Sequence, residues 1–125
     1  MEFIEAPAFS RHSSDYDADE EYRELQYQLA ANTQLGDSMP GTGGFRKLRW
    51  KDPRRGKGKR GGLRIIYYFF LADQQIWLMT LYDKDEASDL TAKQRKALRN
   101  ALEAELQARR AAQLASSKRL RRTRS

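Results

Sequence analysis

The chain has 125 residues, enough for one small domain with a single core, and 33% of its residues are charged. It has no cysteine, which excludes disulfides and thiolate chemistry. Its longest apolar run, IIYYFFLA, is far shorter than the roughly 18 residues of a membrane span, and its start, MEFIEAP, lacks the features of a secretory signal. We therefore expect a cytoplasmic protein that makes no membrane contact.

The net charge of +7 is unevenly distributed along the chain. Residues 1–40 carry −7, residues 41–70 carry +9 and residues 71–125 carry +5. Such a polarised molecule concentrates anions near one face, with an effect that weakens as salt rises. Nucleic acid is therefore the expected partner.

The N-terminal part predicts a strand followed by a helix. EFIE is a short strand that ends at Pro7. From Asp17 the sequence DADEEYRELQYQLAANT indicates a helix, with Asp17 as its cap and Glu20 at the capping-box offset. Its apolar positions fall at helical spacing: Tyr22, Leu25, Leu29 and Ala30. Gly36 and the turn-forming stretch GDSMPGTGG then end the helical pattern.

Three strands are expected next, two of them paired as a central antiparallel hairpin. FRKLRW predicts a strand, and a glycine-rich basic loop over about residues 51–62 follows it. LRIIYYFFLA and QIWLMTLY are strongly β-prone, and Asp73 and Gln74 turn the chain between them. The aromatic residues of this hairpin favour core positions over base stacking; they are Tyr67, Tyr68, Phe69, Phe70 and Trp77.

A final helix is predicted from Thr91, its cap, to about Gln113. Its expected buried stripe is Ala97, Leu98, Ala101, Leu102 and Leu106. Residues 1–113 thus form a single α+β domain, and residues 114–125 form a basic tail that we expect to be flexible.

Alternation along the strands gathers basic side chains. If the FRKLRW strand pairs with the LRIIYYFF strand, then Lys47 and Arg49 share a sheet face with Arg64. Tyr82 and Lys84, at the end of the following strand, would lie at the same rim. Because like charges on one face repel each other, the arrangement indicates a phosphate site rather than packing.

The stretches GTGGFRKLRW, GKGKRGGLRIIYYFF and LYDKDEASDLTAKQRKAL, preceded by DADEEYRELQYQLAANTQLGD, resemble the HigB branch of the RelE-type toxins of bacterial type II toxin–antitoxin modules. The resemblance covers about residues 2–105. It implies a RelE-like fold with a small twisted antiparallel sheet, N-terminal helices and a C-terminal helix. It also implies a metal-independent endoribonuclease without cofactor, which cleaves mRNA in the ribosomal A site and inhibits translation. The implied partners are the ribosome with its rRNA, mRNA, and a neutralising antitoxin, a small helix-turn-helix protein.

The matching positions imply roles for individual residues. Arg64 matches the arginine that contacts the scissile phosphate. Lys47 and Arg49 match the paired basic positions of the preceding strand, one of which the related enzymes use near the attacking 2′-hydroxyl. The remaining catalytic candidates are Lys84 and Tyr82. The strand and the basic loop supply the candidates for RNA or ribosome binding: Lys57, Lys59, Arg60, Arg46, Arg54 and Arg55. The chain departs from the family in two acids beside Lys84, Asp83 and Asp85, which would weaken phosphate contacts there.

The expected chemistry uses the RNA itself as nucleophile. Attack by the 2′-hydroxyl on the adjacent phosphorus requires alignment and stabilisation of the charge on the phosphorane. The fork of Arg64 suits that charge, and either Lys47 or Lys59 could be the general base if neighbouring cations lower its pKa. His12, among Ser and Asp residues, is not expected to be catalytic.

Two other classes of protein carry the same features. One is a non-catalytic RNA- or ribosome-binding protein, whose basic patch holds phosphates without cleaving them and whose binding weakens steeply with salt. The other is a poison of a DNA topoisomerase, as in the related ParE toxins. Codon preference, antitoxin contacts and oligomeric state leave no signal in one sequence.

Overall fold

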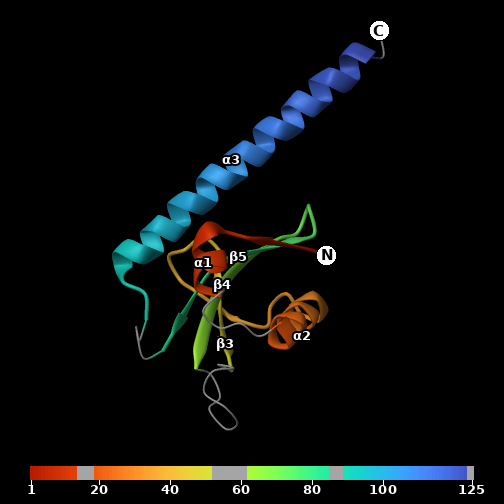
Figure 1. The fold of residues 1–125 in the computed structure, drawn as a ribbon. Helices are drawn as coiled ribbons and strands as arrows, with labels where there is room; N and C mark the ends of the chain where they lie inside the picture. The colour runs from red at the N-terminus through yellow and green to blue at the C-terminus, as the bar shows by residue number, and fades with distance from the viewer. Residues whose placement is uncertain (14–18, 52–61, 85–88, 124–125) are drawn as a thin grey trace.

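A computed structural model of the chain describes residues 1–13, 19–51, 62–84 and 89–123, with side chains as far as Arg119. The elements in chain order are strand β1 (Glu2–Glu5), helices α1 (Pro7–Ser13) and α2 (Asp19–Ala31), strands β2 (Asp37–Ser38), β3 (Arg46–Trp50), β4 (Leu63–Phe70) and β5 (Gln75–Asp83), and helix α3 (Ala92–Thr123) (Figure 1). The fold is α+β, as predicted, and the described strands form one mixed sheet in the order β1-β5-β4-β3-β2.

The sheet differs from the expected antiparallel sheet at one edge. β1 pairs with β5 in parallel, with Phe3 opposite Ile76, whereas the other pairings are antiparallel. Parallel neighbours need a long connection instead of a hairpin, and here helices α1 and α2 and strands β2 to β4 lie between them in the chain. The direction of β1 therefore depends on contacts distant in sequence, which the local pattern of EFIE could not specify. The short strand β2, at the other edge, was not predicted either.

The central hairpin of β4 and β5 is confirmed, with one irregularity. The chain turns through Leu71–Gln74, where Gln74 adopts the left-handed backbone region with a φ of 51°. Further along, the register shifts after Ile66 so that Met79 is skipped in the pairing. Such a bulge interrupts the strict alternation of a strand. As a result Trp77 and Tyr82, an odd number of positions apart, both pack on the face that meets α3.

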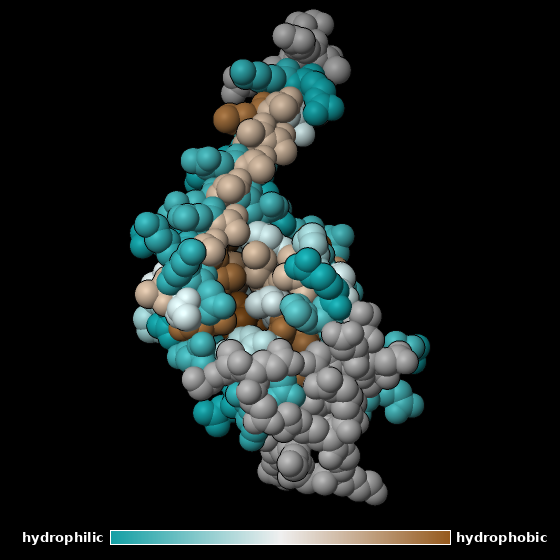
Figure 2. Space-filling model, turned by 60° about the vertical axis from the view of Figure 1, so that its left-hand side comes forward, coloured by the Kyte–Doolittle hydropathy of each residue, from teal (hydrophilic) through white to brown (hydrophobic). Residues whose placement is uncertain are grey.

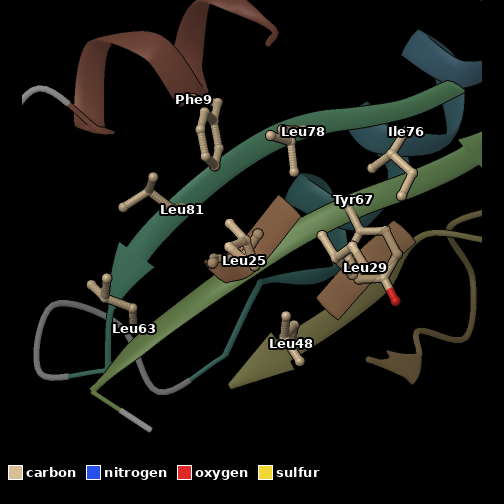
Figure 3. Close-up of a cluster of buried hydrophobic side chains, with 10 residues drawn as sticks. Phe9, Leu25, Leu29, Leu48, Leu63, Tyr67, Ile76, Leu78 and Leu81 are labelled. Carbon is tan, nitrogen blue, oxygen red and sulfur yellow. The ribbon is translucent and has the colours of Figure 1, made fainter. Parts of the chain in front are cut away.

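One face of the sheet is covered by α1 and α2 (Figure 1). Figure 3 shows the buried cluster between the sheet and these helices, in which side chains of β3, β4 and β5 meet those of α1 and α2. Its buried members are Phe9, Leu25, Leu29, Leu48, Leu63, Ile65, Tyr67, Ile76, Leu78 and Leu81. This cluster holds α1 and α2 to the sheet, because its apolar side chains are removed from water only where the two layers meet.

The two N-terminal helices differ from expectation in their bounds. α1 was not predicted, yet Pro7 suits a first helical position, where no N–H is needed, and Phe9 is only 2% exposed. α2 ends at Ala31 and carries Leu25 and Leu29 inward as predicted, but Ala30 is exposed. The predicted cap at Asp17 lies outside the described residues.

The opposite face of the sheet packs against the first half of α3. Thr91 is the predicted cap: the N–H of Gln94 donates to its Oγ1 at 3.1 Å, and its own N–H donates to Gln94 Oε1 at 2.8 Å. This reciprocal pair is a capping box. The buried cluster under α3 consists of Met39, Phe45, Ile66, Phe70, Leu98 and Leu102, with Leu106, Tyr68 and Trp77 packed against it. Ala97, expected in the buried stripe, is exposed.

Helix α3 is longer than predicted. It continues to Thr123 instead of ending near Gln113, in keeping with the Ala, Gln, Lys and Arg residues of this segment, which favour helices. Arg109 holds the helix to the β4–β5 hairpin: its guanidinium lies 3.7 Å from the centre of the Phe70 ring and donates to Asp73 Oδ2 at 2.6 Å. Beyond Arg109 the helix projects away from the sheet (Figure 1). No helix in the described ranges combines the length and apolar composition that crossing a membrane requires.

A buried tyrosine hydroxyl links the sheet to the turn after α2. Tyr67 is fully buried; its Oη accepts a hydrogen bond from the Gly36 N–H at 2.8 Å and donates one to the Thr33 carbonyl at 2.9 Å. Tyr67→Phe leaves both backbone groups without this partner, so we expect the free energy of unfolding to fall by about 1–3 kcal/mol. Urea denaturation measures the change, and Tyr27→Phe, at a ring that is 73% exposed, is the matched control. Equal stability of the two variants would contradict the expectation.

Candidate functional site

A polar row crosses three strands on the face that meets α3. Arg49 on β3 lies directly opposite Arg64 on β4, and Arg64 lies opposite Tyr82 on β5. Side chains in such pairs have Cβ atoms about 4.5–5.5 Å apart. Lys47, two residues before Arg49, points to the same face because strand residues alternate. The predicted gathering of Lys47, Arg49, Arg64 and Tyr82 is therefore confirmed.

Four basic side chains surround a small pocket beside this row. The pocket has a volume of about 250 Å³. Its floor comes from β3 and β4, and its sides come from β2 with the two residues after it and from the first turn of α3. The residues that line it are Asp37, Ser38, Met39, Pro40, Lys47, Arg49, Arg64 and Arg95. Since four bases and one acid line it, the pocket favours an anion.

One carboxylate joins two of these cations. Asp89 lies just before α3; its Oδ1 is 3.3 Å from Lys47 Nζ and its Oδ2 is 3.0 Å from an Nη of Arg95. The Leu90 N–H also donates to Oδ1 at 2.8 Å. This backbone hydrogen bond is the largest effect and lowers the pKa of the Asp89 carboxyl; desolvation, the next largest, opposes it, and Lys47 and then Arg95 lower the pKa further. Asp89 thus stays ionised and holds both cations at the pocket.

Two buried donors at this site have no acceptor in the described part of the chain. They are Tyr82 Oη and Arg95 Nε. Burial raises the pKa of the Tyr82 hydroxyl, the charge of Asp89 raises it further, and Arg64 and Arg95 lower it in part. The phenol is therefore protonated at neutral pH and can donate. Buried donors normally have partners, so the pair points to an acceptor that binds from outside.

The other predicted residues that the structure describes do not line the pocket. Arg46 lies on the opposite face, where its Nη1 donates to the Gly36 carbonyl at 2.8 Å. Lys84 is exposed directly after β5, and its N–H donates to the Gly62 carbonyl. The five loop candidates lie outside the described residues: Lys57, Lys59, Arg60, Arg54 and Arg55.

The acid that was expected to oppose phosphate binding faces away from the site. Asp83 is opposite Leu63 and only 3% exposed, and Leu63 belongs to the cluster under α1 and α2. Its carboxylate is therefore on the other side of the sheet from Tyr82, by simple alternation. Asp85, the second such acid, lies outside the described ranges.

Sequence reasoning missed Arg95 and Asp89. Their local signal is visible, because SDLTAKQR carries a cap at Thr91 and places Arg95 in the first helical turn. Nothing local shows that this turn packs beside β3 and β4, which is what brings Arg95 to Lys47. His12 is exposed on α1, and this helix covers the face of the sheet opposite the pocket.

The site can hold and orient an anion of the size of a phosphate group. Arginine forks and a neutral phenol supply donors in several directions, and Lys47 adds a point charge. The described side chains contain no group of three or more His, Cys, Asp or Glu residues suited to a metal ion. No protein-family model matches the chain.

Removing the Asp89 carboxylate tests whether it competes with an incoming anion. We expect Asp89→Asn to bind a fluorescein-labelled single-stranded RNA up to about fivefold more tightly at low salt, since exposed ion pairs contribute about 0.2–1 kcal/mol. Fluorescence anisotropy measures the affinity. Asp19→Asn, an equal change of charge on α2, is the control and should differ little from the wild type. Weaker binding by Asp89→Asn would show instead that the carboxylate is needed to position Lys47.

The lowered pKa of Asp89 also fixes the pH range of its ion pairs. A carboxyl whose pKa is lower in the folded protein adds stability that is complete above its unfolded value of about 3.9. That contribution to stability is lost as the pH falls through the lower pKa that the carboxyl has in the folded protein. At neutral pH the wild-type carboxylate is therefore present at the pocket, and the RNA measurement belongs there.

Proposed function

We propose that the protein is a metal-independent endoribonuclease of the RelE-like fold, the toxin of a bacterial type II toxin–antitoxin module. In this proposal it cleaves mRNA in the ribosomal A site and so inhibits translation. A small helix-turn-helix antitoxin neutralises it. The observation that carries the proposal is the pocket of about 250 Å³ lined by Lys47, Arg49, Arg64 and Arg95, with two buried donors beside it that lack an acceptor in the described chain.

The charge arrangement supports an RNA phosphate as the ligand. Arg49 and Arg64 are directly opposite each other, and like charges in such a pair destabilise a sheet. A phosphate between them would offset that repulsion and accept bonds from both guanidinium groups. The pocket also lies at the first turn of α3, where the helix dipole favours negative charge.

The proposed reaction is attack by the ribose 2′-hydroxyl on the adjacent phosphorus. The bond from phosphorus to the 5′-oxygen breaks, and the products are a 2′,3′-cyclic phosphate and a 5′-hydroxyl. Arg64 and Arg49 stabilise the extra charge on the equatorial oxygens. In the proposed step Tyr82, protonated because its pKa is raised, donates its proton to the departing 5′-oxygen, a much stronger base than a phenolate.

A base must take the proton of the 2′-hydroxyl, and Lys47 is the candidate at the described site. Its Nζ lies 3.3 Å from Asp89 Oδ1, so Lys47 has to leave this ion pair and release its own proton to solvent before its neutral amine can accept the proton of the 2′-hydroxyl. An incoming phosphate attracts Arg95 and repels Asp89, which loosens the pair. Lys59, the other candidate, lies outside the described residues.

Cleavage of a translated message tests the proposal. The purified protein is added to a translation extract, and RNA ends are mapped by primer extension. We expect cuts at codon positions of the translated message, with fragments that carry a 5′-hydroxyl and so require phosphorylation before ligation. The same RNA without ribosomes should remain intact.

Two outcomes would overturn the proposal. Arrested translation with intact mRNA would assign the pocket to RNA or ribosome binding without cleavage. Double-strand breaks in DNA with intact mRNA would assign the protein to the topoisomerase poisons. Co-expression with the small helix-turn-helix protein of a neighbouring gene, where one exists, should abolish the cuts.

A further inference from the structure

The end of α3 is a charged rod that takes no part in the core. All residues from Arg110 to Arg119 are exposed, and Arg109 makes the last contacts with the sheet that are described. At about 1.5 Å per residue, the helix after Arg109 is roughly 20 Å long. Figure 2 shows it standing clear of the rest of the molecule, with hydrophilic side chains beside a weakly apolar strip. Its sequence therefore does not serve the packing of the domain.

The charge of this rod has one sign only. After Glu105 the sequence contains no acid and seven Lys or Arg residues. Four of these bases fall within residues 118–122 of the sequence. Like charges so close along a chain repel each other, whereas a bound anion would offset the repulsion. The segment is complementary to a polyanion.

We propose that residues 110–123 of α3 form an arm that binds the phosphate backbone of double-stranded RNA. The arm is a helix that projects from the domain, so its charges recur at regular intervals and match the regular phosphate rows of a duplex better than a flexible single strand. Along the helix axis Lys118 is roughly 35 Å from Arg95 at the pocket, so the two cannot share a phosphate. The proposal rests on the proposed function, since it makes the structured RNA of the ribosome the anchor while mRNA occupies the pocket. Two linked binding sites raise the total affinity by raising the effective concentration at the second site.

Binding to an RNA hairpin with a long perfect stem tests the arm without any cleavage step. We expect Arg110→Gln with Lys118→Gln to weaken binding severalfold. The slope of log affinity against log salt should become shallower by about 0.7–0.9 for each phosphate that the variant no longer neutralises. A chain that ends at Gln113 should bind more weakly still. Both variants should keep the thermal midpoint of the wild type, because the removed groups lie outside the core.

The matched control is Arg11→Gln with Arg23→Gln, which removes the same charge from exposed positions of α1 and α2. Unchanged hairpin binding by the shortened chain would overturn the proposal, as would an equal loss in the control, since net charge alone would then explain binding. A wild-type dimer that dissociates on shortening would also overturn it, by assigning the apolar strip of α3 to self-association. Ribosome-dependent cleavage is measured separately, so failure of the arm and failure of the pocket are distinguishable.

Discussion

Arg64→Ala is expected to lower the rate of ribosome-dependent mRNA cleavage by about 10²–10³-fold, the effect of losing one donor to a transition-state oxyanion. Arg64 lies between Arg49 and Tyr82 in the row across the sheet and lines the pocket. Its fork can hold two phosphate oxygens at once, and its place between Arg49 and Tyr82 is one that neither neighbour occupies. The measurement is the rate at which 5′-hydroxyl fragments accumulate in a translation extract at saturating protein.

Two further variants separate the role of Arg64 in chemistry from its charge. Arg64→Lys keeps the charge but loses the fork, so we expect a smaller but clear loss of rate. Arg23→Ala removes an exposed base from α2 and should cleave at the wild-type rate. Wild-type cleavage by Arg64→Ala, with its folding confirmed by circular dichroism, would remove the phosphate-binding role from this residue.

Phe45→Ala is expected to lower the free energy of unfolding by about 3–5 kcal/mol, the usual cost of truncating a buried aromatic residue. Phe45 has no exposed surface and lies at the centre of the cluster under α3, with its ring centroid 5.6 Å from that of Tyr68 and 6.1 Å from that of Trp77. Domains of this size have about 5–15 kcal/mol in total, so the loss is a large share. Urea denaturation at 25 °C measures it.

The effect of Phe45→Ala should also reach the pocket. Phe45 directly precedes β3, and the cluster it fills holds the first half of α3, including the turn with Arg95, against the sheet. The control is Leu71→Ala, at a side chain that is 72% exposed, which should change stability by no more than about 0.5 kcal/mol. A loss below about 1 kcal/mol in Phe45→Ala, well under the usual cost of such a truncation, would mean that α3 is held to the sheet by other contacts.

Much of the local structure could be predicted because its signals lie within a few residues. The hairpin of β4 and β5 follows from two β-prone runs around a turn, and the start of α3 follows from the capping box of Thr91 and Gln94. Alternation placed Lys47 and Arg49 on one face. These features depend on backbone geometry, which repeats with a fixed period.

The bulge in β5 could not be predicted in this way. Strict alternation would place Trp77 and Tyr82 on opposite faces, whereas the skipped Met79 brings both to the side of α3. The position of a bulge depends on how the side chains on either side of it pack in the folded protein. The residues on both sides of Met79 have the composition of an ordinary strand, so composition does not reveal the bulge. The position of Tyr82 beside Arg64 therefore depended on the register of the whole hairpin.

By itself the sequence determined the α+β class, the polarity of charge and the basic face of the sheet, since composition and period are properties of the chain alone. Only the tertiary structure decided the parallel edge at β1 and the joining of Lys47 to Arg95 through Asp89. Lys47 lies on β3 and Arg95 on α3. These two elements meet because the apolar faces of the sheet and the helix are buried against each other, and no local sequence pattern shows which faces will pair. The pocket therefore arises where α3 crosses the sheet.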